Sequence, residues 1–502
     1  MLVTLTATTI LVYALLAGMV GLVVYRWRAL FLRGVPELSA TGLSLFRVAL
    51  GVALFWAMAV SLRLPDVVAP GGPESEAALW QPWSWVDYLA GHWNLRDAIQ
   101  MATLVAIVAF AAGLYARTAY LLVAAGFLVR LLVLQEYGVG SHAWVILPLA
   151  LAPLVIVPWG EGLSIDNLFR RWRGRPSRVR PLGAHYGLAI WVPGLVLSSA
   201  LFAAAASKLA ESGTEWVTGG AVRYHWAEDH LSAPVSWGAW IAAHEDLSIL
   251  LSAVGVAVEA LFLTHLFFRS QWIRASYGLA AMSLLLGFYA FQGVFWFAWW
   301  LLLLAFVPWE AIAGLVRRVA RLSINADEPV THAVSINNAP RWYGGIAVIT
   351  AVVCVQQLAI SRADVEQMPF FSNYPMYSGT WDSPDAFNEG LAPVKFYRYD
   401  YLTRDTGGQF KNISGRVLSA GIDSALRDAV LAQLRYPDEP LEPSTRELLV
   451  KAEADYEEQF GSPLIEVRIV AHAREFDFEH GGLRRRRDPP AITVDLQTLT
   501  VG

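Results

Sequence analysis

Long apolar runs alternate with short polar stretches through the first 360 residues of the chain. A helix needs about 20 mostly apolar residues to cross the hydrocarbon of a bilayer. We expect about ten membrane-spanning helices, at residues 2–24, 43–62, 98–115, 118–134, 143–158, 188–206, 248–268, 275–291, 294–316 and 343–360. Segment 79–93 is too polar to cross and rich in tryptophan, which predicts a helix lying flat in the membrane interface.

Arginines concentrate in alternate loops between these runs. The loops after the first, third, fifth, seventh and ninth runs contain Arg26, Arg28 and Arg33; Arg117; Arg170, Arg171, Arg173, Arg175, Arg178 and Arg180; Arg269 and Arg274; and Arg317, Arg318, Arg321 and Arg341. The opposite loops are poor in basic residues, with mainly Arg63, Arg96, Lys208 and Arg223. Because cytoplasmic loops carry the excess of Lys and Arg, the arginine-rich loops are predicted to be cytoplasmic. The N-terminus and residues 361–502 are then extracytoplasmic, and 2–24, which has no basic residue before it, is a retained helix.

The pattern changes after residue 360, where charged residues reach the density of a soluble domain. Alternating segments predict strands and 3.6-residue periodicity predicts helices. The predicted order is strands 394–401 and 410–417 joined at Gly407–Gly408, helices 421–435 and 444–460, then strands 464–478 and 491–499. Residues 361–502 are therefore expected to form a small extracytoplasmic α+β domain. The run Arg484–Arg487 reads as a solvated turn or as a binding site for anionic lipid or an acidic partner, and linker 369–378 as a lid or an interfacial anchor.

Composition supports a polytopic α-helical membrane protein of the cell inner (plasma) membrane. Hydrophobic residues make up 56% of the chain and charged residues only 16%, so lipid must replace water around much of it. The 21 tryptophans suit aromatic belts at the two interfaces. A net charge of −4 gives no indication of a nucleic-acid partner. The single cysteine, Cys354, excludes an intrachain disulfide and a cysteine-rich metal site.

Ionisable side chains at membrane depth are costly and need a partner or a function. The candidates are Arg47, Arg130, His142, Lys208, Glu259 and His265. Lys208, at the outer end of 188–206, either extends to the headgroups or is desolvated among helices, where its neutral amine can act as a base. Glu259 lies in mid-span and is expected to be functional or paired with a cation, with Arg47 one possible partner. His142 begins a span as an interfacial residue or a catalytic partner, and His265 is expected to be interfacial.

No metal site is expected. The chain has no HExxH, Walker or GxSxG motif. Asp87 and His92, or the cluster His225, Glu228, Asp229 and His230, could bind a metal by composition, but a solvated outer loop has the same composition.

Four segments in order resemble a known family. They are 44–56 (SLFRVALGVALFW), 111–122 (AAGLYARTAYLL), 141–168 (SHAWVILPLALAPLVIVPWGEGLSIDNL) and 203–222 (AAAASKLAESGTEWVTGGAV). The most specific pieces are a Phe-Arg early in a span, a Ser-x-Asp after a span, and Lys-Leu followed by Trp-Val and a glycine. This pattern resembles the membrane domain of the vitamin K-dependent gamma-carboxylase and its bacterial relatives, the HTTM proteins, over about 43–310 within the membrane domain 1–360.

The resemblance implies an enzyme that oxygenates a reduced quinone, of the vitamin K hydroquinone or menaquinol type, and carboxylates glutamate side chains with O2 and CO2 as co-substrates. It implies Lys208 as the base and His142 as a second catalytic residue, and we expect Arg47, Glu259 and Trp216 to bind the quinol. A carboxylase of this kind is a carbon–carbon lyase. The partners expected are membrane lipid and a peptide or protein on the extracytoplasmic side. The alternative is a non-catalytic HTTM protein that binds lipid, quinone or a peptide; a transporter is disfavoured because no inverted repeat is visible.

Overall fold

The computed structural model describes residues 34–61, 86, 88–89, 92–136, 142–176, 182–235, 237–319, 381, 383–395, 398–405, 410–412, 464–486, 492–495 and 500–501. The chain divides into two compact units. The first comprises residues 1–218, 251–290 and 294–379, and the second comprises 219–250, 291–293 and 380–502. The second unit therefore joins the C-terminal residues to a loop region of the membrane part, a grouping that a single boundary near residue 361 does not anticipate.

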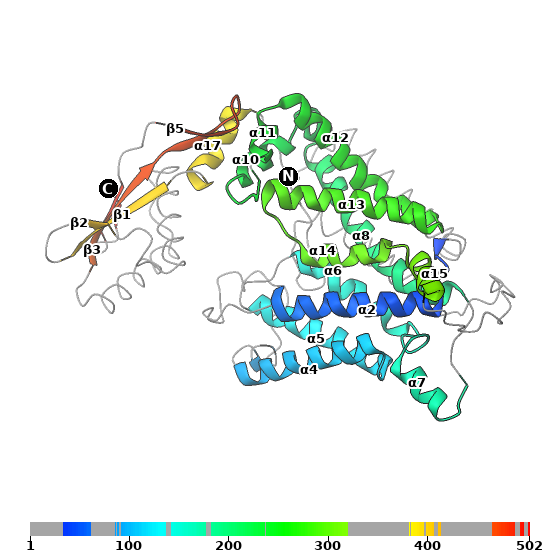
Figure 1. Cartoon of the computed structure of the whole chain (residues 1–502). Coiled ribbons are helices and arrows are strands. Elements are labelled where there is room, and N and C mark those ends of the chain that lie inside the picture. Colours follow the sequence, from blue (N-terminus) through cyan, green and yellow to red (C-terminus); the bar gives the residue numbers. More distant parts are fainter. Residues whose placement is uncertain are drawn as a thin grey trace, which may run out of the picture. The chain divides into compact units, whose positions relative to one another are not determined.

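Helices make up the described part of the first unit (Figure 1). They are α2 (Ala40–Trp56), α4 (Trp93–Ala112), α5 (Ala116–Glu136), α6 (His142–Leu151), α7 (Ile165–Trp172), α8 (Ala184–Glu211), α9 (Glu215–Thr218), α12 (Glu245–Leu261), α13 (Gln271–Gln292), α14 (Phe297–Leu302) and α15 (Trp309–Val319). The first six residues of α12 and the last two of α13 belong to the second unit. Short η segments extend four of them: η1 (Ala57–Ser61), η3 (Ala152–Ile156), η4 (Phe262–Phe267) and η5 (Leu303–Phe306).

Six of the predicted spans are confirmed as helices long and apolar enough to cross a membrane. Within the described residues they are Ala40–Val60, Asn94–Ala112, Ala116–Leu134, His185–Glu211, Glu245–Phe267 and Gln271–Gln292. Several apolar helices of this length are typical of a multi-pass membrane protein. The predicted spans 2–24 and 343–360 lie outside the described residues, as do most of 79–93 and all of the linker 369–378.

Two predicted spans take a different form. Residues 143–158 form α6 and the short η3, with Pro148 inside the helix and Pro153 at the start of η3. Residues 294–316 are broken, and Phe297–Phe306 and Trp309–Val319 meet at 65°. Pro308 lies between them, and because proline lacks an N–H and disfavours helical geometry in the residue before it, the helix ends there.

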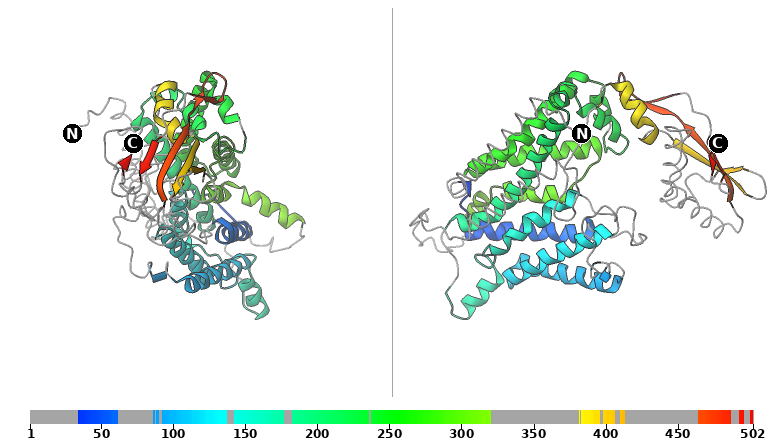
Figure 2. Two further views of the ribbon diagram at one scale, coloured as in Figure 1. Left: turned by 90° about the vertical axis from the view of Figure 1, so that its left-hand side faces the viewer. Right: turned by 180° about the vertical axis from the view of Figure 1, so that it is seen from behind.

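Small residues let the helices of the first unit approach closely. A Cβ at Gly51 of α2 would lie 2.7 Å from Ala111 Cβ on α4, and one at Gly126 of α5 would lie 2.1 Å from Thr103 Oγ1 on α4. Such contacts are the usual basis of helix association in lipid, where apolar burial gives little driving force. Accordingly α2, α4 and α5 lie side by side in all views (Figures 1 and 2). Of the six candidate spans, α8 is the most enclosed, since 83% of an apolar 18-residue stretch of this helix is buried.

The loops predicted to share one side of the membrane meet at one end of the helices. Leu38 and Gly183 form an isolated β-bridge, and Leu266 O lies against Gly34. The backbone N–H groups of Tyr115 and Ala116 donate to the Asp166 carboxylate, and that of Ser39 donates to Glu310. These contacts connect residues that adjoin all five arginine-rich loops, here called the arginine-rich end.

The described part of the second unit contains α10 (Val222–Asp229), α11 (Trp237–Ala242), α17 (Pro384–Lys395) and seven strands. The strands are β1 (Arg398–Asp405), β2 (Phe410–Asn412), β3 (Leu464–His472), β4 (Arg474–Asp477), β5 (Gly482–Arg485), β6 (Ile492–Asp495) and β7 (Thr500–Val501). One antiparallel sheet has the order β2-β1-β3-β6-β7, and β4 pairs with β5 separately. The predicted hairpin across Gly407–Gly408 is confirmed as β1 and β2, but its first strand is 398–405 rather than 394–401, because residues 394–395 still belong to α17. The predicted helices 421–435 and 444–460 lie outside the described residues.

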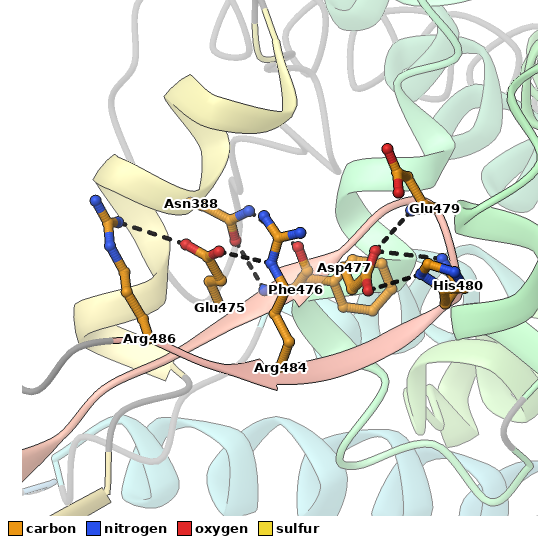
Figure 3. A network of polar contacts seen from close by, with 8 residues as sticks. All are labelled: Asn388, Glu475, Phe476, Asp477, Glu479, His480, Arg484 and Arg486. Atoms are coloured by element: carbon orange, nitrogen blue, oxygen red, sulfur yellow. Dashed lines mark hydrogen bonds and ion pairs between the residues drawn. The ribbon is translucent and has the colours of Figure 1, made fainter.

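The predicted long strand 464–478 is wrong, because the chain leaves the large sheet after His472 and turns back as the β4–β5 hairpin. Gly481 has a φ of +70°, a backbone conformation that favours glycine and permits this tight reversal. Arg484 and Arg485 consequently belong to β5 rather than to a turn. The Arg484 guanidinium donates to Glu475 across the hairpin, an interaction that raises the pKa of Arg484 (Figure 3).

An aromatic core holds this hairpin against α10, α11 and α17. Phe387, Phe476 and Phe478 pack with Tyr224 in one buried cluster. The Asn388 side chain donates to the Phe476 carbonyl and accepts from its N–H, at 2.9 and 2.8 Å (Figure 3). The Asn388 side chain thus satisfies both backbone groups of Phe476, as a neighbouring strand would. The membrane-loop helices and the C-terminal hairpin thus share a core.

Candidate active site

Lys208 lies within the last turn of α8, whose helix runs to Glu211. Its side chain is only 2% exposed, so it does not extend into the surroundings of the protein. With a rise of about 1.5 Å per residue, Lys208 lies roughly 35 Å along α8 from the helix start at the arginine-rich end. The amine is therefore enclosed among helices near the opposite end of α8.

Glu259 on α12 is the partner of this lysine. Nζ of Lys208 lies 2.6 Å from Oε1 and 2.7 Å from Oε2 of Glu259, which is 1% exposed. Both oxygens face the same ammonium, so each charge is compensated by the other. Removing one member of a buried pair costs about 3–5 kcal/mol because the other charge is left uncompensated. At this point α8 and α12 are therefore joined by an ion pair rather than by apolar packing.

Trp216 completes the enclosure of the lysine. The ring centroid lies 5.0 Å from Lys208 Nζ, within the range of a cation–π interaction, and the side chain is 3% exposed. Trp216 lies on the short helix α9, flanked by Gly213 and Gly220 with φ of +60° and +62°. The two left-handed glycines fold the chain back after α8 and bring the indole onto the amine.

An amine and a carboxyl group in direct contact can exchange a proton. Transfer of one proton from the ammonium to the carboxylate leaves a neutral amine and a carboxylic acid, a form that an apolar surrounding favours over separated charges. A neutral amine can then accept a proton from an acidic hydroxyl. The sequence identified all three residues, but not that Lys208 and Glu259 are each other's partner.

Arg47 does not belong to this group, and the predicted Arg47–Glu259 pairing is wrong. Its guanidinium donates to the backbone carbonyls of Ala111, Trp159 and Leu163, at the arginine-rich end. The side chain is 1% exposed and has three fixed acceptors, so a distant carboxylate is neither needed nor within reach. Arg47 therefore joins the middle of α2 to the end of α4 and to the loop before α7, rather than contributing to the site around Lys208.

The Ser-x-Asp motif also has a structural role at this end. Ser164 Oγ accepts the N–H of Asn167 as the N-cap of α7. The Asp166 carboxylate accepts the N–H groups of Tyr115 and Ala116, where α5 begins. Both helix starts are thereby capped by a hydrogen-bond acceptor at a position where a negative charge is favourable.

His142 is confirmed as the first residue of a helix, α6. Its side chain lies outside the described part of the molecule, so a role beside Lys208 remains a prediction. Helix α6 packs against α8, the helix that carries the lysine.

His265 is not interfacial, contrary to the prediction. It is fully buried because α12 continues into η4 and places the ring against α8. Its Nδ1 lies 2.9 Å from Phe262 O and 3.0 Å from Ser198 Oγ. Arg274, counted from the sequence as a loop arginine, is likewise buried, in the first turns of α13. Arg130 is buried as well.

Within the described part of the chain, His225, Glu228, Asp229 and His230 do not form a group able to share a metal ion, and Asp87 lies outside that part. Among the described residues, the group whose ligand atoms lie within 4.8 Å of one another is Asp477, Glu479 and His480. These side chains cap the β4–β5 turn. Burial would raise the pKa of Asp477, but hydrogen bonds from the Glu479 N–H, the His480 ring and the His480 N–H outweigh it and lower the pKa (Figure 3).

Comparison of the chain with known protein families, with curated proteins and with solved structures gave no match.

Proposed function

We propose that this protein is a membrane enzyme that takes a proton from a reduced quinone at Lys208. One observation carries the proposal: an amine and a carboxylate, each almost fully buried, lie 2.6 Å apart between two candidate membrane-spanning helices. Buried ionisable groups in such helices are costly and usually functional. The resemblance to the gamma-carboxylase membrane domain points to the same lysine on separate grounds.

The proposed step consists of two proton transfers, from Lys208 to Glu259 and from the quinol to Lys208. Glu259 holds the proton that leaves Lys208, and the neutral Nζ accepts the quinol O–H proton. The products are an ammonium and a quinol anion, whose charges compensate each other. Trp216 faces the amine and helps to exclude water, so that the anion meets oxygen rather than bulk solvent.

In the full proposed reaction the quinol is oxidised to its epoxide and O2 is reduced, with one oxygen atom in the epoxide and the other in water. The strong base formed on the way removes a γ-proton from a glutamate side chain. The resulting carbanion forms a carbon–carbon bond with CO2, giving a second carboxylate. Vitamin K hydroquinone or menaquinol, O2 and CO2 are the co-substrates, and the glutamate belongs to a peptide or protein.

The proposal includes an orientation. The chain has about ten spans in the cell inner (plasma) membrane, with the arginine-rich loops cytoplasmic and the N-terminus and C-terminal domain extracytoplasmic. Lys208, about 35 Å along α8 from the arginine-rich end, then lies toward the extracytoplasmic face. The second unit is on the same side and is available to bind the peptide.

A non-catalytic HTTM protein that binds lipid, quinone or a peptide is the second candidate. One observation favours it: Lys208 donates to both carboxylate oxygens of Glu259, so each charge already has its partner. A purely structural ion pair between α8 and α12 would have the same geometry.

The test compares the wild type with Lys208→Met, Glu259→Gln and the double variant Lys208→Met/Glu259→Met, each purified into lipid nanodiscs. Reduced vitamin K, O2, labelled bicarbonate and a glutamate-rich peptide are supplied, and quinone epoxide and peptide-bound label are measured. Wild type should form epoxide, and the lysine variants should be at least ~100-fold slower, the usual contribution of a general base.

The double variant separates catalysis from folding. Replacing a buried pair by apolar residues of similar size is often neutral for stability, so its thermal midpoint should stay close to wild type. A folded double variant that still forms epoxide would exclude Lys208 as the base. If wild type consumes neither vitamin K hydroquinone nor menaquinol, the enzymatic proposal fails and the binding protein remains.

A further inference from the structure

A pocket lies at the arginine-rich end of the first unit. Its volume is about 340 Å³, within the range of small-ligand sites. The wall combines apolar side chains with charged ones, among them Leu38, Phe306, Trp309, Arg269, Arg274 and Glu310. An amphiphilic lining of this kind suits a ligand with a polar head and an apolar body.

Arg274 is the unusual member of this wall. It is 2% exposed, and its guanidinium lies 5.5 Å from the Phe306 ring centroid. Nη2 donates to the Ile190 carbonyl at 3.3 Å, but among the described residues Nη1 has no hydrogen-bond partner. A buried guanidinium without a counter-charge is expensive, which points to an acceptor from outside the chain.

The neighbouring polar groups do not supply that acceptor. Both carboxylate oxygens of Glu310 are occupied, one by Arg317 Nη2 at 2.7 Å and the other by the Ser39 N–H at 2.9 Å. Glu37 is exposed. His265, whose Nε2 lies near the same point beside Gly194 as Arg274 Nη2, carries no negative charge.

The pocket wall also has an exposed cation. Arg269 lies two residues before the start of α13, whose first turn is the positive end of the helix dipole. The wall thus has two cations, Arg269 and Arg274, and two carboxylates, Glu37 and Glu310, of which Glu310 is already paired with Arg317. The sign of the ligand therefore rests on the unmet donor of the buried Arg274.

We propose that this pocket binds a phosphate oxyanion, held by Arg274 with Arg269 at the entrance, and that the phosphate belongs to the headgroup of an anionic membrane lipid. The apolar wall takes the start of the acyl chains. Basic pockets between membrane helices at the cytoplasmic side are a known setting for such headgroups. The site is independent of Lys208, which lies near the other end of α8.

Thermal unfolding of the full chain in a neutral detergent tests the site. Phosphatidylglycerol, phosphatidylcholine and inorganic phosphate are titrated separately into wild type, Arg274→Gln and the matched control Arg171→Gln. Arg171 lies on α7 and does not line the pocket. A ligand that binds only the folded state raises the thermal midpoint in proportion to its occupancy.

Phosphatidylglycerol should raise the midpoint of wild type and of Arg171→Gln, and at least tenfold more lipid should be needed for the same shift in Arg274→Gln. A shift with inorganic phosphate alone would assign the site to a free anion and overturn the lipid proposal. Equal shifts in all three proteins, or none in wild type, would remove the site altogether. If Arg274→Gln does not fold, Arg269→Gln should show the same loss more weakly, and an unaltered response there would count against the pocket.

Discussion

At the scale of single residues, the buried cations Lys208 and Arg47 of the first unit are stabilised by different kinds of partner. Lys208 is compensated by a carboxylate, whereas Arg47 donates to three backbone carbonyls from two segments, the end of α4 and the loop before α7. A guanidinium suits the second kind of partner because its five donors spread in a plane, while an ammonium is a point charge. This difference has a measurable consequence.

Replacing Arg47 by lysine should destabilise the protein although the charge is kept. The amine cannot reach three carbonyls at once, and each lost charged hydrogen bond costs about 1.5–3 kcal/mol. We expect a loss of at least ~3 kcal/mol in unfolding free energy, measured as a lowered thermal midpoint in detergent. The exposed Arg171 on α7 offers a matched Arg→Lys control that should leave the midpoint unchanged. An Arg47→Lys variant as stable as wild type would contradict the structural role.

The sequence indicates a loop arginine at the buried Arg274, because it lies at the start of an apolar run. Lys208 and Glu259 could be identified from the sequence, because an ionisable group inside an apolar run is conspicuous. Their pairing could not, since helix order in space decides which charges meet. Glu259 lies fifty-one residues after Lys208, and nothing local connects them. The backbone acceptors of Arg47 could not be predicted for another reason. Every residue has a backbone carbonyl, so the sequence does not mark the three that accept from Arg47.

At the scale of elements, the β4–β5 hairpin links the C-terminal region to α10 and α11 within the second unit. Phe476 and Phe478 lie in its aromatic core, and His230 at the end of α10 meets the Phe476 ring edge-on at 5.2 Å. Burial lowers the pKa of His230, against a smaller raising effect of the hydrogen bond to the Ala227 carbonyl. The neutral imidazole is therefore the form that the folded unit favours.

The second unit should lose stability as the pH falls below the ordinary pKa of histidine, about 6.5. Below that pH the unfolded chain binds a proton at His230 that the folded chain resists, so unfolding becomes easier until the folded pKa is reached. Thermal midpoints at pH 7.5 and 5.5 measure the effect. His230→Asn keeps a donor for the Ala227 carbonyl but does not titrate, and it should reduce the difference.

His244 on the same unit is the control for this experiment, because it is exposed and bonded to the Trp240 carbonyl. His244→Asn should leave the difference between the two pH values as it is in wild type. An identical difference in wild type and His230→Asn would show that other groups cause the pH dependence.

Strand and helix periodicity predicted the β1–β2 hairpin and six of the spans. It failed where the chain changes direction inside a periodic run: alternation continues from β3 into β4 although the two strands pair with different neighbours. Similarly, the apolar run 294–316 continues through Pro308 while the helix axis turns by 65°. Hydrophobic periodicity records which residues are buried, but not the direction of the chain between them.

At the scale of the whole molecule, the positive-inside pattern made a geometric prediction without any structure. Loops assigned to one side should lie together, and contacts among residues 34–39, 115–116, 166, 183, 266 and 310 satisfy it. The compartment that this end faces is a separate question, because it depends on the membrane rather than on the fold.

Thiol labelling answers it, since Cys354 is the only cysteine and can be replaced by serine. Cysteines are then placed singly at Trp172, which is 79% exposed on α7, and at Leu231, which is 63% exposed after α10. In intact cells or right-side-out vesicles, an impermeant maleimide should label position 231 at once and position 172 only after permeabilisation. The reverse order would invert the proposed orientation, and equal labelling would refute the sidedness of the loops.

The Lys208–Glu259 pair also sets a condition on how the chain is made. Helix α8 leaves the ribosome before α12, so for a time it carries a lysine whose partner has not yet been synthesised. A lysine without a counter-charge is unfavourable within a membrane-spanning segment. Stable membrane integration of α8 is therefore tied to the arrival of α12, and the two helices should leave the translocon as a pair. A substitution at Glu259 should therefore lower the amount of protein that is stably inserted during synthesis, before it affects the finished molecule.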